Sequence, residues 1–207
     1  MLKERPPNNF GIAFILAIMI AVGTGVLILV LGKNGSFQLI NSNHNEIADQ
    51  IFKYFTHYGD GVMWAALGLF SFFFKRKYFI AVLAGAIIST LLAQFLKRVV
   101  YPDELRPFSY LSENFPVHLI DGVPIRKIHS FPSGHTTTAF TMALIMSHMI
   151  NKKSWSVILI ILAGLAGYSR VYLSQHFLTD ILGGICIGIF SGIIALLCKK
   201  SEKSLAS

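Results

Sequence analysis

Three short clusters of polar residues stand beside long apolar segments of this chain. They are Lys97 with Arg106-Pro107, Pro132-Ser133-Gly134-His135, and Ser169-Arg170 with His176 and Asp180. Ionisable side chains next to hydrocarbon are costly and therefore rare, and those that occur usually have a function. Three cations, two histidines and one aspartate are the groups needed to bind an anion, attack it and protonate a leaving group. The clusters therefore predict a site for chemistry on an anionic group.

The third cluster pairs a histidine with an aspartate. His176 and Asp180 are four residues apart, so on a helix their side chains share a face and can touch. A carboxylate bound to one imidazole nitrogen fixes the tautomer and leaves the other nitrogen available as a base or nucleophile. A structural pair that braces a helix end is the alternative, and the spacing alone does not decide between them.

The second cluster is typical of a helix start. Proline and serine are favoured at the first positions of a helix, and glycine lets a ligand approach the backbone closely. The N–H groups at such a start bind anions. An ordinary capped helix start would account for Pro132 and Ser133 but not for His135. We therefore expect His135 to face the anion, as a candidate proton donor.

The three cations differ in how strongly they indicate a site. Arg170 lies six residues before His176, so a break in the helix near 173–176 is needed to bring both into one pocket. Arg106 offers a guanidinium fork that suits phosphate. Lys97 adds a point charge, although a lone lysine at this depth would more simply extend towards the lipid head groups.

The composition is that of a membrane protein with several spans. Of the 207 residues, 54% are hydrophobic and 14% are charged, and the mean hydropathy is +0.60. We expect one all-α membrane domain over residues 1–207, a bundle of about six transmembrane helices. The predicted spans are about 10–31, 56–74, 78–96, 131–150, 155–174 and 177–198. The net charge of +8 arises mainly beside these segments, and without a clustered basic face it does not predict nucleic-acid binding.

Basic residues predict the orientation of the bundle. Ten fall on one side of the six-span arrangement, namely Lys3, Arg5, Lys75, Arg76, Lys77, Lys152, Lys153, Lys199, Lys200 and Lys203. Eight fall on the other side, and three of those are the cations of the clusters. The positive-inside rule makes the first side cytoplasmic, with both termini inside. All three clusters then lie at the outer ends of their spans, so the topology gathers them at one face.

The outer connections contain further polar and amphipathic residues. Ile47–Phe55 has apolar residues at helical spacing, and a helix on the membrane surface or a loop helix packed on the bundle explains it equally well. Four polar residues near these connections are predicted to be solvated or to support the site rather than to be catalytic: His57, Asp60, His118 and His129.

Together the clusters resemble the three-part signature of the type 2 phosphatidic acid phosphatase family, the membrane lipid phosphatases related to vanadium haloperoxidases. The second part matches fully at Pro132–His135, and the third matches fully as Ser169-Arg170, five residues, His176, three residues and Asp180. The first part departs from the pattern. The family usually has six residues between its lysine and Arg-Pro, whereas eight separate Lys97 from Arg106. Either the chain near Pro102 bulges and Lys97 still points inward, which we favour, or Arg98 replaces it.

The resemblance implies a role for each residue. His176 would be the nucleophile that forms a phosphohistidine, Asp180 would orient it, and His135 would protonate the leaving oxygen. The phosphoryl oxygens would be held by Lys97, Arg106, Arg170 and the Ser133–Gly134 segment. No metal or other cofactor is expected, because the cations take the place of a metal.

The expected substrate is a lipid phosphate in the outer leaflet of a membrane, most simply the bacterial inner membrane. The resemblance implies phosphatidate, phosphatidylglycerophosphate, a polyprenyl diphosphate or a lipid A phosphate, and nothing in the sequence selects among them. Two alternatives use the same cations. One is a transporter or binding protein for an anion or lipid phosphate, which would place polar residues near the bilayer midplane. The other is a vanadate-dependent oxidation site on the same scaffold.

Overall fold

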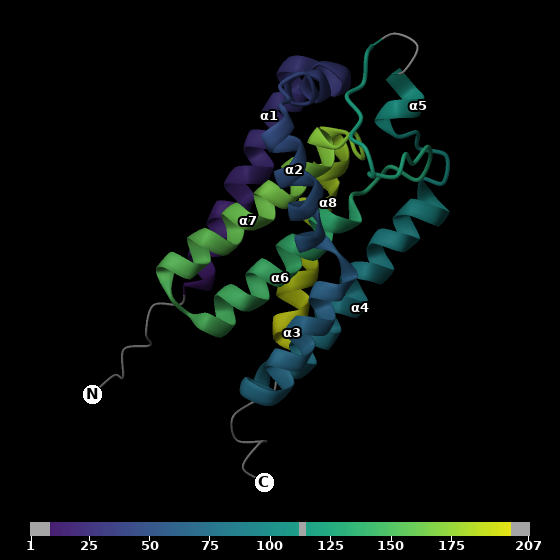
Figure 1. Cartoon of the computed structure of the whole chain (residues 1–207). Helices are drawn as coiled ribbons and strands as arrows, with labels where there is room; N and C mark the ends of the chain where they lie inside the picture. The colour runs from purple at the N-terminus through teal and green to yellow at the C-terminus, as the bar shows by residue number, and fades with distance from the viewer. Residues whose placement is uncertain (1–8, 112–114, 200–207) are drawn as a thin grey trace, which may run out of the picture.

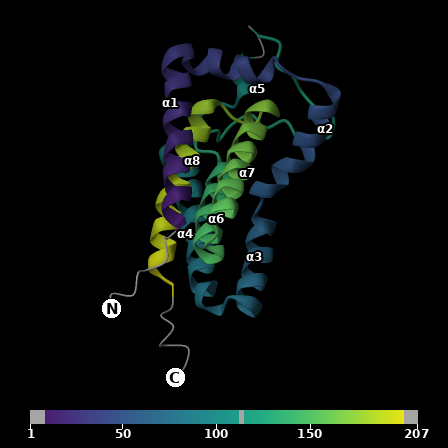
Figure 2. The same cartoon turned by 90° about the vertical axis from the view of Figure 1, so that its left-hand side faces the viewer.

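The computed structural model describes residues 9–111 and 115–199, and every regular element among them is helical. Figures 1 and 2 show an elongated bundle of roughly parallel and antiparallel helices. The α-helices are α1 (Phe10–Asn41), α2 (Glu46–Phe55), α3 (Gly61–Phe74), α4 (Phe79–Phe95), α5 (Pro107–Leu111), α6 (Gly134–Ile150), α7 (Lys153–Tyr172) and α8 (Leu178–Leu197). Short 3-10 turns cover Thr56–Gly59 and Arg76–Tyr78, and a π-helical turn, Leu96–Val100, extends α4.

The central helix α6 is buried on almost all sides, between α4, α7 and α8. It is nevertheless rich in threonine, and its hydroxyl groups bond back to its own backbone. Thr137 Oγ1 donates to the carbonyl oxygen of Ser133 (3.0 Å), and Thr141 Oγ1 donates to that of Thr137 (2.7 Å). A hydroxyl satisfied in this way can be buried at little cost. The surrounding helices therefore shield α6 from lipid, although α6 is less apolar than α4 and α8.

Glycines set the close contact between α6 and α8. A Cβ atom added at Gly188 would lie 2.7 Å from Cβ of Phe140, and one added at Gly184 would lie 2.8 Å from the carbonyl oxygen of Ser133. Small residues at such spacing let two membrane helices approach each other closely. The backbone N–H of Ser133 then donates to the carbonyl oxygen of Asp180 (3.0 Å), so the starts of α6 and α8 are joined directly.

The helices differ from the predicted spans in several places. Gly32 has a φ of 70°, which breaks α1 where the first span was predicted to end, and the helix then resumes as far as Asn41. The predicted span 56–74 begins later, at Gly61, because the 3-10 turn is followed by an extended Asp60. The other predicted boundaries lie within a few residues of the observed ones.

Four helical stretches are long and apolar enough to cross a membrane, as judged over the described residues: Phe10–Asn41, Arg76–Val100, Lys153–Tyr172 and Leu178–Leu197. The remaining two helices of the predicted six are shorter. α3 has 14 residues and α6 has 17, against the roughly 20 that a bilayer requires. The chain is therefore an all-helical membrane protein, and the count of six spans stays a prediction.

One end of the bundle collects the basic connections. The Nδ2 group of Asn9, just before α1, donates to the carbonyl oxygen of Asn151 (2.9 Å), between α6 and α7. The ammonium of Lys199, after α8, lies 5.4 Å from the ring centre of Tyr78, before α4. Lys75–Lys77, Lys152, Lys153 and Lys199 thus share this end, opposite the long connection from α4 to α6 (Figure 1). Lys3, Arg5, Lys200 and Lys203 lie outside the described residues.

The amphipathic stretch Ile47–Phe55 forms helix α2. One face of this helix packs on the bundle, and another face is exposed. Phe52 packs on Tyr168 and Tyr172 of α7, with ring centres 5.2 and 4.7 Å apart. Ile47 and Ile51 are 75% and 56% exposed on another face. The helix is packed on the bundle and also presents an apolar stripe outward, which suits a helix at the membrane surface.

We predict that Gly188→Ala destabilises the bundle while Gly68→Ala does not. The added methyl at Gly188 would overlap Phe140 Cβ and the backbone oxygen of Thr137, which lies 3.0 Å away, and overpacking of this kind costs about 1–3 kcal/mol. Nothing lies within 4 Å of a Cβ at Gly68, in the middle of α3. Thermal unfolding in detergent should show a lower midpoint for Gly188→Ala alone. Equal midpoints for the two variants would contradict the close packing of α6 and α8.

Candidate active site

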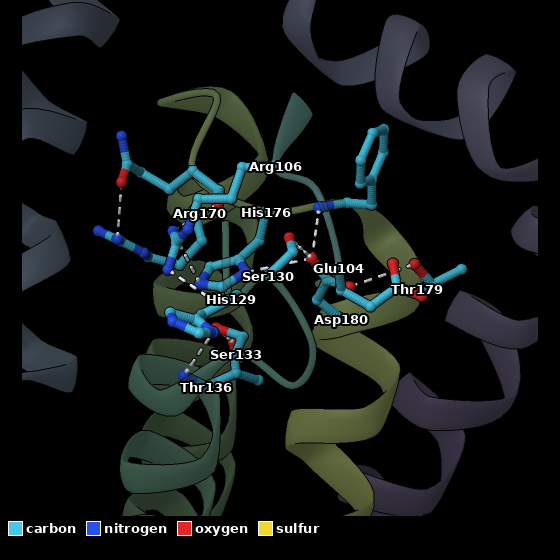
Figure 3. Close-up of polar contacts among 12 residues, drawn as sticks. Glu104, Arg106, His129, Ser130, Ser133, Thr136, Arg170, His176, Thr179 and Asp180 are labelled. Atoms are coloured by element: carbon cyan, nitrogen blue, oxygen red, sulfur yellow. Dashed lines mark hydrogen bonds and ion pairs between the residues drawn. The ribbon is translucent and has the colours of Figure 1, made fainter. Parts of the chain in front are cut away.

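A cavity of about 250 Å³ lies at the end of the bundle that is opposite the basic connections. Six of the predicted site residues line it: Lys97, Arg106, Gly134, His135, Arg170 and His176. Asp180 does not line the cavity but contacts His176, as Figure 3 shows. Ser133 directly precedes Gly134 in the sequence. Segments more than 70 residues apart in the sequence therefore meet in one place, as the predicted topology requires.

The junction between α7 and α8 brings Arg170 and His176 together. α7 ends at Tyr172, and Ser174 adopts a positive φ of 56°. The N–H groups of Gln175 and His176 both donate to the carbonyl oxygen of Arg170, at 2.9 and 3.1 Å. This tight turn replaces the continuous helix on which the two side chains would point to different faces. The helix break that the sequence required is present.

The carboxylate of Asp180 is held by three donors. Its Oδ2 accepts from Ser130 Oγ (2.5 Å), from the N–H of Phe177 (3.0 Å) and from Nδ1 of His176 (3.1 Å). The side chains of His176 and Asp180 are only 2% and 3% exposed. A carboxylate bound so firmly fixes the orientation of the imidazole ring.

The other ring nitrogen of His176 faces the cations. Its Nε2 atom lies 3.5 Å from a terminal nitrogen of Arg106. Because a guanidinium only donates, this Nε2 carries a lone pair, and the ring proton sits on Nδ1 towards Asp180. Burial and the charges of Arg106, Lys97 and Arg170 lower the pKa of His176 well below its ordinary value. The imidazole is therefore neutral, with its lone pair directed at the cationic cavity.

Backbone carbonyl groups fix the guanidinium of Arg106. Nε donates to the carbonyl oxygen of Ile128 (3.0 Å), and the terminal nitrogens donate to those of Gln175 (2.7 Å) and His129 (3.3 Å). The residue is 3% exposed. These bonds orient the charge without neutralising it, so that it remains available to an anion.

Arg170 is held in a similar way from α7. One terminal nitrogen donates to Thr56 Oγ1 (2.7 Å) and the other to Gln175 Oε1 (3.4 Å). Its buried Nε has no hydrogen-bond partner among the described residues. A buried donor without an acceptor is costly, and a phosphoryl oxygen in the cavity is an acceptor of the right kind.

The start of α6 supplies the second cluster. Ser133 caps the helix, because its Oγ accepts from the N–H of Thr136 (3.4 Å) and from Thr136 Oγ1 (2.9 Å). It is fully buried and, unlike Gly134, does not line the cavity. Ser133 therefore shapes the helix start, and Gly134 and His135 are the residues that reach the cavity.

Lys97 and Arg98 have different surroundings. Lys97 lines the cavity, whereas Arg98 is exposed and its Nε donates to Gln94 Oε1 (3.0 Å). Both lie in the π-helical turn Leu96–Val100. A π-helical turn accommodates an extra residue within a helix, so this turn takes up part of the longer spacing between Lys97 and Arg106. The geometry agrees with the inward-pointing Lys97 rather than with Arg98.

Two residues at the site were not predicted, and a third was predicted only in general terms. Ser130 holds Asp180, and Arg126 lines the cavity as a further cation. Asp60 also lines the cavity, and its Oδ1 lies 2.6 Å from Nε2 of His135. Asp60 was expected to be solvated or to support the site, with no partner named for it. Ser130 and Arg126 are ordinary loop residues by type.

A model of the PAP2 superfamily matches residues 77–203, which hold all three clusters. This chain belongs to the PAP2 superfamily. The undecaprenyl-diphosphatase BcrC of Bacillus subtilis is 31% identical over 157 residues, which cover 74% of this chain and 76% of that protein. The undecaprenyl-diphosphatase of Sulfolobus acidocaldarius is 29% identical over 163 residues, covering 77% of this chain and 75% of that protein.

The fold agrees with this assignment. The crystal structure of Aquifex aeolicus LpxE superposes with a TM-score of 0.69 at 34% identity, and covers 78% of this chain and 92% of that one. The resemblance stated from the motifs is therefore confirmed, and the chain is a membrane phosphatase, a hydrolase of phosphoric esters. An enzyme is favoured over the transporter or binding protein that the cations alone also allowed.

We predict that Lys97→Gln lowers phosphatase turnover by about 10²-fold, the usual effect of losing one preorganised charge stabiliser. Arg98→Gln, which removes the same charge one residue away, should retain turnover within a few-fold. The measurement is the rate of phosphate release by the two purified variants. Comparable losses in both variants would mean that the charge of this segment matters, and not the position of Lys97.

Proposed function

We propose that this PAP2 enzyme hydrolyses a phosphate ester or diphosphate of a membrane lipid through a phosphohistidine intermediate on His176. The observation that carries the proposal is the arrangement of this one imidazole. Its Nδ1 is bound to Asp180, and its Nε2 is directed towards a buried guanidinium. A neutral nucleophile thus faces the place where the cations would hold a phosphoryl group.

In the first step, Nε2 of His176 attacks phosphorus, and the bond from phosphorus to the lipid oxygen breaks. Arg106, Arg170 and Lys97 stabilise the charge on the phosphoryl oxygens, with help from the N-terminal backbone of α6 at the Ser133–Gly134 segment. Asp180 stabilises the positive charge that forms on the ring of His176. These cations perform the work that a metal ion performs in other phosphatases, so we propose a reaction without a metal or other cofactor.

His135 carries the protons. It donates one to the departing lipid oxygen, which leaves as an alcohol or as a lipid monophosphate. It then accepts a proton from the water that attacks the phosphohistidine, and this second step releases inorganic phosphate and restores Nε2 of His176. The proton count closes, because the proton given in the first step is regained in the second.

The substrate class is proposed from the relatives and from the position of the site. Two relatives that cover most of the chain are named undecaprenyl-diphosphatases, which makes a polyprenyl diphosphate the first substrate to test. Phosphatidate, phosphatidylglycerophosphate and lipid A phosphates complete the panel. A site at the helix ends suits a lipid whose tail stays in the bilayer while its phosphate enters the cavity.

The orientation belongs to the same proposal. We infer one membrane domain of six spans, with the basic end and both termini in the cytoplasm and the site at the outer leaflet of a bacterial inner membrane. The shared end of Lys75–Lys77, Lys152, Lys153 and Lys199 supports this orientation through the positive-inside rule.

We predict that His176→Ala abolishes both turnover and covalent labelling. Wild-type protein in detergent is mixed with a substrate carrying radioactive phosphate, quenched in alkali to preserve phosphohistidine, and separated on a gel. Label should appear on wild type and be absent from His176→Ala, with turnover lower by at least about 10⁴-fold. The assays include a chelator throughout. Wild-type turnover by His176→Ala would overturn the mechanism, and loss of wild-type activity that a divalent ion restores would overturn its independence of metals.

A further inference from the structure

We propose that Asp60 is the positioning residue for the proton carrier His135, so that the site contains two His–Asp pairs rather than one. This inference rests on the proposed function, because it takes His135 as the group that protonates the leaving oxygen. Asp180 orients the nucleophile from behind, and Asp60 orients the proton carrier from the opposite wall of the same cavity.

The two oxygens of Asp60 bind two different histidines. Oδ1 lies 2.6 Å from Nε2 of His135, and Oδ2 lies 2.6 Å from Nδ1 of His57. The side chain of His135 is 26% exposed and that of His57 is 64% exposed. One oxygen therefore reaches into the site, and the other is held from the solvent side, which leaves the carboxylate little rotational freedom.

The ordinary explanation for an aspartate at this position does not apply. Asp60 is the N-cap residue of α3, where aspartate usually accepts a hydrogen bond from the first turn of its own helix. Here its side chain makes no such capping bond. The carboxylate contacts His135 instead, so the start of α3 lacks the side-chain hydrogen bond that an N-cap aspartate usually provides.

The turn before Asp60 contacts the site at two further points. A Cβ atom at Gly59 would lie 2.7 Å from Cβ of His135 and 2.7 Å from its carbonyl oxygen, so only glycine allows this approach. Thr56 Oγ1 accepts from the guanidinium of Arg170 (2.7 Å). The segment Thr56–Asp60 therefore touches the proton carrier through Gly59 and Asp60, and a phosphate-binding cation through Thr56.

The negative charge of Asp60 also affects the protonation of His135. His135 shares its cavity with Lys97, Arg106, Arg126 and Arg170, and these cations oppose the protonated imidazole that a general acid requires. Burial raises the pKa of Asp60, but the hydrogen bond from His57 and the charges of His135, His57 and Arg170 outweigh it and hold that pKa below its ordinary value. A fixed negative charge thus stands next to His135, where it offsets the repulsion.

The test separates proton transfer from phosphate binding by changing the leaving group. Protonation matters for a lipid alcohol, which is a poor leaving group, and hardly matters for p-nitrophenolate, which departs as an anion. We expect Asp60→Asn to lower the rate of phosphohistidine formation from the lipid phosphate by about 10- to 100-fold, less than His135→Ala does. Formation of the same intermediate from p-nitrophenyl phosphate should stay within about threefold of wild type, because only this first step depends on the leaving group. His57→Ala, which removes the outer partner of the same carboxylate, should cause a smaller loss than Asp60→Asn, because the contact between Asp60 and His135 remains.

A double-mutant cycle on the lipid substrate supplies an independent readout. If Asp60 acts through His135, then His135→Ala with Asp60→Asn should be no slower than His135→Ala alone. Additive losses, equal losses in the rate of phosphohistidine formation from the two substrates, or wild-type turnover of the lipid phosphate by Asp60→Asn would each overturn the inference. Failure of the proposed function is distinguishable, because it would show as turnover that persists in His176→Ala whatever residue stands at position 60.

A second observation carries a separate inference. It concerns a groove that runs along α3 from Tyr58, next to the site, to Lys75 at the basic end of the bundle. A cavity of about 560 Å³ lies between α3, α6 and the start of α7, and it shares no residue with the site cavity. Its walls are apolar and rich in methionine: Met63, Phe70, Met142, Met146, Met149 and Trp155. Two lysines also line it: Lys75, which directly follows α3, and Lys152, which directly precedes α7.

We infer that this groove binds one anionic phospholipid of the leaflet opposite the site. Methionine side chains adapt to the shape of an acyl chain, and Trp155 is typical of the boundary between head groups and hydrocarbon. Basic pockets between membrane helices bind acidic head groups. The two lysines lie at the end of α3 that is farthest from Asp60, so the head group would sit away from the catalytic cavity. This position distinguishes the bound lipid from a substrate.

Native mass spectrometry in detergent tests this inference with phosphatidylglycerol and phosphatidylcholine as probes. Wild type should retain one phosphatidylglycerol in preference to phosphatidylcholine, and Lys75→Gln with Lys152→Gln should weaken that retention by about tenfold. The control, Arg76→Gln with Lys153→Gln, removes two charges at the same end from residues that do not line the groove, and should retain the lipid. Equal retention of the two lipids, or equal loss in both variants, would overturn the inference.

Discussion

The structure depends on keeping several positive charges close together at the end of an apolar bundle. Arg106 and Arg170 are 3% and 7% exposed, and they share one cavity with Lys97 and Arg126. The fold orients both buried guanidinium groups with uncharged oxygens: three carbonyl oxygens for Arg106, and a hydroxyl and an amide for Arg170. Carboxylate partners would have neutralised these charges. Neutral partners leave the cavity with an excess of positive charge, which a phosphate group would offset.

The two carboxylates at the site stand in different surroundings, and the difference matches the roles proposed for their histidines. Asp180 is buried and accepts from three donors, so the ring of His176 has one orientation and one tautomer. Asp60 is about one-third exposed and is shared between His135 and His57. A nucleophilic imidazole has to be neutral and correctly oriented when it attacks, whereas a proton carrier has to gain and lose its charge in each cycle. A carboxylate in contact with solvent tolerates that change better than one that is sealed in the core.

Much of this arrangement follows from the sequence, because it depends on local spacing and on the order of the apolar segments. The four-residue step from His176 to Asp180 needs only a helix start, with His176 just before α8 and Asp180 in its first turn. The meeting of the three clusters needs only helices that alternate in direction. Asp60, Ser130 and Arg126 could not be placed in this way. Their positions are set by the path of irregular segments and by contacts with residues far away in the chain, such as Ser130 with Asp180. The break at Gly32 and the π-helical turn at Lys97 are also tertiary effects, since an apolar segment looks the same with or without them.

The site is assembled from two parts of the chain that lie on different elements. His135, Arg170, His176 and Asp180 are fixed by the packing of α6 against α8 and by the turn after α7, and that packing relies on glycine at positions 184 and 188. The segment Thr56–Asp60 reaches the site from outside this framework, between the surface helix α2 and the short helix α3. Because it contacts both His135 and Arg170, a displacement of this segment would affect the proposed proton carrier and a proposed phosphate-binding cation together. The helix ends thus position the proposed nucleophile and cations, and the segment Thr56–Asp60 holds the proposed proton carrier from the other side of the cavity.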